Sequence, residues 1–327
     1  MYEKLGEILL RDGETVEAGV VSGPDPEWAG RVEKLLGHKG PLWNWQNSAA
    51  VRRALDVEVV FYLLHRDGAP FSNMMTATYR GAGHFGHVWT DPADRRKGAA
   101  SQLMGLLMAD FGERGGRALF LGTGHDSAPY RIYASHGFGG IEAESGYMEY
   151  YAGGREAFEA DYFEAGETDI GPAAWRHWGA SAALFLGDWP EPVRCLPLGL
   201  LARSSTEGPW LEVMQAQEEN DQARVRVLES KGSGAVVGVA AWDWDAHWPE
   251  TCVVDVYCHP AFWVRAGALL ESLDLPAAER YVAYSAGPEK AAVLQEAGFG
   301  QVAELKGRVA LDHRRRQRAD VSVWERP

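Results

Sequence analysis

The sequence predicts an α/β fold of the α+β kind, with two tandem domains that each hold a mixed, mostly antiparallel twisted sheet flanked by helices. Three observations support this prediction. The first half places hairpins of β-branched and aromatic segments before a strand–helix–strand–helix series. The second half repeats that order, as expected for a duplicated and diverged unit. Between them, Ala152-Gly153-Gly154 is the best boundary signal, so we expect domains at residues 1–152 and 153–327.

Elements of the first half follow from hydrophobic period and turn residues. Asp67-Gly68 is a hairpin turn between two strands. Apolar residues at helical spacing over 99–111 predict a helix, and the wholly apolar run 118–121 suits a buried strand. The predicted helices are 28–36, 48–55 (capped by Ser48), 99–111 and 126–136, and the predicted strands are 57–64, 71–79, 84–90 and 118–121.

The second half repeats these patterns after a connecting helix at 155–165. Helices are predicted at 172–186, 266–273 and 289–297, and strands at 224–228, 236–244, 251–258 and 281–285. Two segments align without gaps: 88–92 with 256–260, and 136–138 with 297–299. We infer a tandem duplication from this alignment.

Composition limits the classes of function. The 327 residues carry 32 Lys+Arg against 46 Asp+Glu, a net charge of −14 that disfavours nucleic-acid binding and would attract a cationic substrate. Three cysteines fit a reducing compartment better than a disulfide framework. Neither a signal peptide nor a membrane span is visible, so the expected location is the cytoplasm, with no membrane partner. No zinc-ligand spacing occurs, and no metal is expected.

The most informative stretch is the turn after the strand at 84–90. Gly98 would let a phosphate approach the backbone, and the small residues Ala99, Ala100 and Ser101 keep that approach open. Free N–H groups in the first turn of the following helix favour anions. The basic residues Arg95, Arg96 and Lys97 add complementary charge. The alternative is an ordinary solvated basic turn before a helix, and spacing by itself does not decide between them.

Two motifs carry a family resemblance. The pattern Val88-x-Thr90-x-Pro92-x-x-Arg95-x-x-Gly98-x-Ala100 resembles the coenzyme-binding motif of the GCN5-related N-acetyltransferase (GNAT) superfamily. The later segment Tyr133-Ala134-Ser135-His136-Gly137-Phe138 resembles the second signature of that family, Tyr-x-x-x-Gly-Phe on a helix. The resemblance covers residues 55–150 well and the second half only as architecture, so it implies two tandem GNAT-like domains.

The resemblance implies a role for each matched position. Backbone N–H groups from Arg96 to Ser101 would hold the pyrophosphate of acetyl-CoA, the co-substrate. The strand edge at Val88, Trp89 and Thr90 would pair with the pantetheine arm. Asp126 stands where the family often has Asn, and a carboxylate cannot donate as an amide does. The full set of expected coenzyme-binding residues is Val88, Trp89, Thr90, Arg95, Arg96, Lys97, Gly98, Ala99, Ala100, Ser101 and Asp126.

Catalytic residues follow from the same resemblance. Tyr133 would protonate the departing coenzyme A thiolate, and its alternative role is that of a core aromatic. His84 falls at a strand position where several members carry a base, and its alternative is a hydrogen-bonded strand histidine. His87 would face the other side of a regular strand. His125 and Asp126 also remain candidates for the cleft.

The second copy has lost these features. By offset, Trp263 replaces Arg95, Ala266 replaces Gly98 and Leu294 replaces Tyr133. We therefore expect a degenerate second domain that shapes the substrate cleft, stabilises the first domain or mediates homodimer formation.

The sequence thus predicts an acetyl-CoA-dependent N-acetyltransferase that transfers an acetyl group to an amine of a small molecule or peptide by direct attack on the thioester. A non-catalytic acyl-CoA sensor or interaction module is the alternative, and transfer of a longer acyl group also stays open. The negative net charge favours a cationic amine as acceptor.

Overall fold

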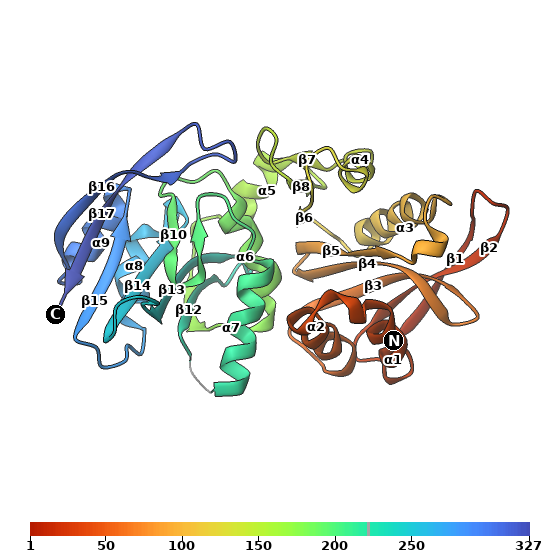
Figure 1. Ribbon diagram of the computed structural model, residues 1–327, viewed down its shortest axis with the longest axis horizontal. Helices are drawn as coiled ribbons and strands as arrows, with labels where there is room; N and C mark the ends of the chain where they lie inside the picture. The colour runs from red at the N-terminus through yellow and green to blue at the C-terminus, as the bar shows by residue number, and fades with distance from the viewer. Residues whose placement is uncertain (221–222) are drawn as a thin grey trace. The chain divides into compact units, whose positions relative to one another are not determined.

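The computed structural model describes residues 1–220 and 223–327. The chain divides into two compact units (Figure 1): unit 1 is Met1–Ile141 with Ser145–Gly154, and unit 2 is Glu142–Glu144 with Arg155–Pro327. Among the helices within the described residues, none combines the length and the apolar character needed to cross a lipid bilayer. The assignment of coenzyme binding to the first domain and of a degenerate role to the second stays a prediction.

Unit 1 contains an eight-stranded mixed sheet. Its strands are β1 (Tyr2–Leu9), β2 (Thr15–Ser22), β3 (Glu58–Arg66), β4 (Ala69–Tyr79), β5 (Ala82–Thr90), β6 (Ala118–Gly122), β7 (Gly139–Gly140) and β8 (Tyr147–Tyr151). Their spatial order is β1-β2-β3-β4-β5-β6-β8-β7, in which β5 and β6 are parallel and the other neighbours antiparallel. The helices are α1 (Pro26–Leu36), α2 (Pro41–Arg52), α3 (Ala99–Glu113) and α4 (Ala128–Ala134), with the 3-10 turns η1 (Gly37–Lys39) and η2 (Pro92–Asp94).

Helices cover both faces of the first sheet, with α3 on one face and α1 and α2 on the other (Figure 1). Residues at helical spacing on α3, among them Leu103, Leu107 and Phe111, are buried in the main core of unit 1. Tyr133 of α4 and Phe85 of β5 belong to the same core. This face is the one on which the predicted coenzyme turn and Tyr133 both lie.

The N-terminal region differs from the prediction. Residues 2–22 form the β1–β2 hairpin, which the sequence analysis did not assign because charged residues interrupt its alternation. Helix α2 begins at Pro41, with Gly40 before it, so Ser48 lies within the helix and does not cap it. The hairpin at Asp67-Gly68 is confirmed, and both residues adopt positive φ, as its turn requires.

Unit 2 contains a seven-stranded sheet and a small hairpin. The sheet strands are β9 (Thr168–Pro172), β12 (Val225–Ser230), β13 (Val236–Trp244), β14 (Thr251–Cys258), β15 (Arg280–Ser285), β16 (Gly300–Ala310) and β17 (Arg318–Arg326), and the hairpin strands are β10 (Val193–Cys195) and β11 (Leu200–Leu201). The helices are α5 (Arg155–Tyr162), α6 (Trp175–Leu186), α7 (Glu207–Asn220), α8 (Ala266–Glu271) and α9 (Pro288–Glu296), with the 3-10 segments η3 (Leu196–Leu198) and η4 (Pro260–Arg265).

The two sheets share one topology, which confirms the predicted tandem fold. The order in unit 2, β16-β17-β15-β14-β13-β12-β9, matches β7-β8-β6-β5-β4-β3-β2 of unit 1, and β14 and β15 are again the parallel pair. The two Gly-Phe turns also agree, since Phe138 N–H donates to Tyr133 C=O at 3.2 Å and Phe299 N–H donates to Leu294 C=O at 3.0 Å. The sequence analysis had not assigned β9, β10, β11, α7, β16 or β17.

Candidate functional site

Strands β5 and β6 separate partway along their length. They pair in parallel over Ala82–Ala118, Gly83–Leu119 and His84–Phe120, and no further pair follows. β6 remains paired with β8, and β5 remains paired with β4 as far as Thr90. Among the described strands, none pairs with the β6-facing side of β5 beyond His84; we call this stretch, residues 85–90, the splayed edge. Such an edge offers main-chain groups to an extended ligand, and the predicted Val88, Trp89 and Thr90 lie on it.

A β-bulge interrupts β5 within the splayed edge. Gly86 lies opposite Met75 and Trp89 opposite Asn73, so two residues of β5, His87 and Val88, oppose one residue of β4. His87 adopts a φ of 53°. The extra residue changes the alternation: the ring of His87 contacts Trp43 of α2 at 5.2 Å between centroids. The expectation of a regular strand at His87 is therefore wrong, because the bulge turns this side chain toward the α2 face.

The turn after β5 presents unbonded amides at the start of α3. Gly98 has a φ of 87° and immediately precedes the 15-residue helix, and Arg96 has a φ of 66°. No acceptor among the described residues takes a hydrogen bond from the backbone N–H groups of residues 95–101. These amides and the positive end of the helix dipole favour an anion at this position.

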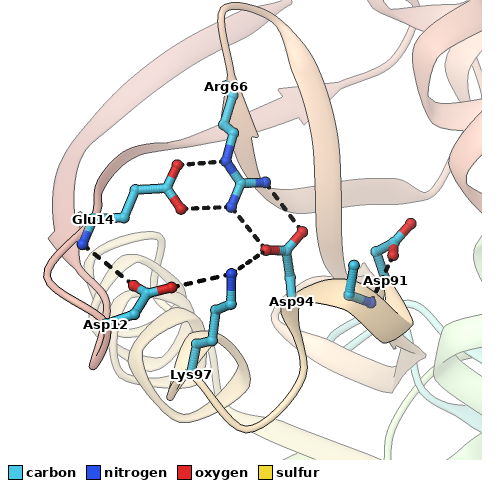
Figure 2. A network of polar contacts seen from close by, with 7 residues as sticks. Asp12, Glu14, Arg66, Asp91, Asp94 and Lys97 are labelled. Carbon is cyan, nitrogen blue, oxygen red and sulfur yellow. Dashed lines mark hydrogen bonds and ion pairs between the residues drawn. The ribbon is translucent and has the colours of Figure 1, made fainter.

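A polar network braces this turn against the β1–β2 hairpin, as Figure 2 shows. Lys97 Nζ lies 3.0 Å from carboxylate oxygens of both Asp12 and Asp94. Arg66 binds Glu14 through two contacts of 2.6 and 2.7 Å, and it also binds Asp94 at 2.8 Å. Hydrogen bonds from Arg66 hold the pKa of Asp94 below its usual value. The charge of Lys97 is thus balanced by two carboxylates, so this residue holds the turn in place.

Three arginines lie near the turn. Arg95 Nε donates to Thr90 C=O at 3.0 Å, and its guanidinium lies 4.7 Å from the Trp89 ring centroid. Arg96 forms no ion pair with any described residue. The third, Arg11, was missed by the sequence analysis: a Cβ at Gly98 would lie 3.4 Å from its Cγ and Nε. No local signal could have found Arg11, since the ladder between β1 and β2 brings it there.

Tyr133 lies in the core beside β5. It is 4% exposed, and its ring contacts Phe85 edge-on at 5.1 Å between centroids. Burial raises the pKa of the Tyr133 phenol well above its usual value. No described residue forms a hydrogen bond with the hydroxyl. Its oxygen is not among the completely buried polar atoms that lack a partner. The phenol therefore stays protonated at neutral pH and has its proton available to a ligand.

The remaining predicted residues are not gathered at one point. His84 has no exposed surface and lies between Ala77 and Phe120 in the sheet. Asp126 has a φ of 53°, and its carboxylate accepts a hydrogen bond from Arg131 at 2.9 Å. The His125 ring contacts Tyr130 at 5.2 Å between centroids.

The corresponding region of unit 2 is filled by its own chain. β14 and β15 pair over three residues, from Thr251 to Val253, and then separate in the same way. The β10–η3–β11 segment lies against β14, and the Leu196 N–H donates to Asp255 Oδ2 at 2.8 Å. Lys290 of α9 forms an ion pair with Asp255, and its Nζ donates to Val193 C=O at 2.6 Å. Burial raises the pKa of Asp255 to about 6.

A carboxylate also accepts hydrogen bonds from the backbone amides before α9. Glu191 accepts hydrogen bonds from Gly287 N–H at 2.7 Å and from Ala286 N–H at 3.1 Å. No left-handed glycine precedes α8, where Arg265 occupies the N-cap with a φ of −95°. Within its described residues, unit 2 therefore keeps the topology of unit 1 but has a chain segment against β14 and no left-handed glycine before α8.

Comparison with known proteins gives matches at the level of structure. No family model and no curated protein sequence matches this chain. An N-acetyltransferase from Staphylococcus aureus Mu50 is 14% identical, with a TM-score of 0.32, over 49% of this chain and 98% of that protein. A putative acetyltransferase from Salmonella typhimurium, solved with acetyl-CoA, is 18% identical, with a TM-score of 0.36, over 49% of this chain and 94% of that protein.

A GNAT superfamily phosphinothricin acetyltransferase from Sinorhizobium meliloti, in complex with acetyl-CoA, is 18% identical, with a TM-score of 0.34, over 49% of this chain and 88% of that protein. Each of these three solved structures covers about half of this chain. At this level of similarity, residue roles have to come from the site described above.

Proposed function

We propose that unit 1 is an acetyl-CoA-dependent N-acetyltransferase that acts on a small-molecule or peptide amine. The observation that carries this proposal is the pair formed by the splayed edge and the unbonded amides of residues 95–101. A coenzyme with a diphosphate and an amide-containing arm needs both: anion-binding N–H groups and a free strand edge. Acetyl-CoA would supply the activated acetyl thioester.

The chain's residues take distinct roles in this proposal. The amides from Arg96 to Ser101 hold the diphosphate, with Gly98 providing the left-handed turn and Arg95 and Arg96 the positive charge. Ala99 and Ala100 leave room for the phosphates, and Lys97 fixes the turn. Val88, Trp89 and Thr90 align the pantetheine arm. Asp126 is engaged by Arg131, so any coenzyme contact from it would come from its backbone.

Tyr133 and the backbone of the bulge supply the chemistry. As the amine attacks the thioester carbonyl, Tyr133 gives its phenol proton to the departing thiolate, while backbone donors stabilise the carbonyl oxygen. His84 stays the sequence-derived candidate for the base. Because it has no exposed surface, it would act through another group. In this proposal the cytoplasmic location and a homodimer also remain predictions.

The test combines a binding titration with one variant. We expect the protein to bind one equivalent of acetyl-CoA by calorimetry. Tyr133→Phe should keep the Kd within twofold and lower kcat by a factor of about 10², which is typical for the loss of a general acid. Thiol release from acetyl-CoA in the presence of amines gives kcat. If the wild-type protein binds acetyl-CoA but releases no thiol with any amine, it is an acyl-CoA sensor. If it binds none, the proposal fails.

A further inference from the structure

Four buried polar side chains gather where α2 covers the bulge of β5. Gln46, Asn47, Asn73 and His87 are at most 7% exposed. Together they contribute six side-chain atoms with no hydrogen-bond partner among the described residues, including both ring nitrogens of His87 and both amide atoms of Asn47. We call these four residues the amide–imidazole cluster. Leaving so many buried polar atoms unbonded destabilises a fold, so packing would favour apolar residues here.

Contacts tie the cluster into one region. Asn73 Nδ2 donates to His87 C=O at 2.8 Å, so the amide of β4 holds the bulge of β5. Gln46 Nε2 lies 3.8 Å from Met75 Sδ, two residues along β4 from Asn73. Trp43, which contacts the His87 ring, shares a face of α2 with Gln46 and Asn47, since residues at i, i+3 and i+4 lie on one side of a helix.

The cluster and Tyr133 lie on opposite faces of β5. Phe85 and Tyr133 pack together in the core beneath α3, whereas His87 turns toward α2. A thioester placed along the splayed edge would thus have a phenol on one side and an imidazole on the other. That arrangement suits attack by an amine from the α2 side and departure of the thiolate on the Tyr133 side.

We propose, on the basis of the function above, that the amide–imidazole cluster is the acceptor site, that it binds a small amine bearing neutral or anionic polar groups, and that His87 takes the proton that this amine loses. The amine nitrogen bonds to the thioester carbonyl carbon and the C–S bond breaks. The amine proton passes to His87, and the coenzyme thiolate takes a proton from Tyr133. Exchange with solvent then restores both residues.

The class of acceptor follows from the side chains present. The cluster contains three carboxamides and no carboxylate, so nothing in it would pair with a second ammonium group. The charged or titratable neighbours that act on His87 are Lys39 and His38 of η1, while Trp43, Gln46 and Asn47 of α2 and Asn73 and Met75 of β4 carry none. An amino acid or its amide fits this surrounding better than a polyamine, although the chain as a whole is acidic.

The protonation state of His87 suits the step. Burial, with smaller effects from Lys39 and His38, lowers its pKa to about 3, so the imidazole is neutral throughout the working pH range. An amine that has bonded to the carbonyl is a stronger acid than a free ammonium ion, which makes proton transfer to the neutral imidazole less unfavourable. The ring of Trp43 contacts the ring of His87 edge-on, at 5.2 Å between centroids, and is the α2 side chain next to the proposed base.

The first experiment sets the acceptor class. Wild-type protein with acetyl-CoA is given L-alanine, L-glutamate and L-alaninamide, and in parallel spermidine and cadaverine, and thiol release is followed. We expect turnover with at least one member of the first group and a kcat/KM at least tenfold lower with the polyamines. Preference for the polyamines, or turnover of none by a protein that binds acetyl-CoA, overturns the proposal. Failure to bind acetyl-CoA contradicts the proposed function instead.

The second experiment tests His87. His87→Asn keeps a residue type that tolerates positive φ and removes the imidazole. We expect kcat/KM for the acceptor to fall by a factor of about 10² with the Kd for acetyl-CoA within twofold. His65→Asn is the matched control, because His65 is also buried in this sheet, at 4% exposure, and should keep turnover. Unchanged kcat/KM in His87→Asn overturns the proton-transfer role.

A third variant separates a binding role from a structural one. Asn47→Leu nearly preserves the shape of the side chain and removes two unpartnered polar atoms. We expect a higher Tm, because buried unbonded groups are lost, and a KM for the acceptor about tenfold higher at similar kcat. A variant with a raised Tm and an unchanged KM would show that Asn47 does not contact the acceptor, which contradicts the assignment of the cluster.

Discussion

The two units have the same strand order but differ where the parallel pair separates. In unit 1, no described strand pairs with the β6-facing side of β5 beyond His84, and the turn that follows places Gly98 before a long helix. In unit 2, the β10–η3–β11 segment lies against β14, and Glu191 bonds to the amides before α9. The shared topology is thus combined with an open strand edge in unit 1 and with an additional segment against the corresponding strand in unit 2.

We expect unit 2 to lack the ligand site that we propose for unit 1. Amides and strand edges that bind no ligand need other partners in the chain or water. In unit 2, the β10–η3–β11 segment and the ion pair between Lys290 and Asp255 lie beside β14. Glu191 binds the amides before α9, the helix that corresponds to α4 of unit 1 and not to α3. We expect these contacts to stabilise unit 2 without a ligand, and we expect a bound ligand to stabilise the splayed edge and the turn of unit 1.

The largest expected effect comes from removing the buried ion pair between Lys290 and Asp255 in unit 2. Lys290→Met leaves the Asp255 carboxylate buried without its cation, and we expect the free energy of unfolding of unit 2 to fall by about 3 kcal/mol. Urea denaturation followed by tryptophan fluorescence measures this change. The control is Lys231→Met, which removes exposed contacts to Glu167 and Asp169 and should change little. Equal effects of the two substitutions would mean that the buried pair does not hold the segment.

The next effect concerns the turn of unit 1. Gly98→Ala forces a side chain into a left-handed conformation at 3.4 Å from Arg11, and we expect the Kd for acetyl-CoA to rise about tenfold. Gly115→Ala is the matched control, because Gly115 is also left-handed, with a φ of 75°, but has open space around it. Calorimetric titration gives both values. Equal affinities in the two variants would remove the turn from the coenzyme site.

The smallest effect is a pH-dependent one on the polar network of Figure 2. Arg66 lowers the pKa of Glu14 and Asp94 below their ordinary values of 4.5 and 3.8. The stabilisation is therefore present above those ordinary values and is lost as the pH falls through the lowered ones. We expect Arg66→Gln to lower the Tm by a few degrees at pH 7, and the difference from wild type to shrink below about pH 4. A difference that grows at low pH would contradict this sign.

The sequence was most informative where residues act locally. Gly98, the small residues after it and the Tyr133–Phe138 spacing predicted the left-handed turn before α3 and the helices α3 and α4, because each depends on a few neighbouring residues. The β1–β2 hairpin escaped prediction, since its exposed face is charged and its partner strand lies far along the chain. Because the hairpin was not predicted, Arg11 and the contact of Asp12 with Lys97 were missed as well.

Register was the other quantity that local patterns could not supply. The bulge at His87 depends on how β4 and β5 align, and it reverses the side of the sheet expected for that residue. Likewise, no local pattern in residues 187–201 predicts that they lie against β14. Glu191 reaches the amides of residues 286 and 287 only through the tertiary fold. The amide–imidazole cluster, which we propose as the acceptor site, could therefore be identified only from the structure.

Hydrogen–deuterium exchange with and without acetyl-CoA tests the central comparison most directly. If the splayed edge and the turn of unit 1 hold the coenzyme, amides at residues 88–90 and 96–101 become protected, and those at residues 260–266 of unit 2 exchange as before. Protection of the unit 2 residues, or of neither region at saturating acetyl-CoA, would contradict the account.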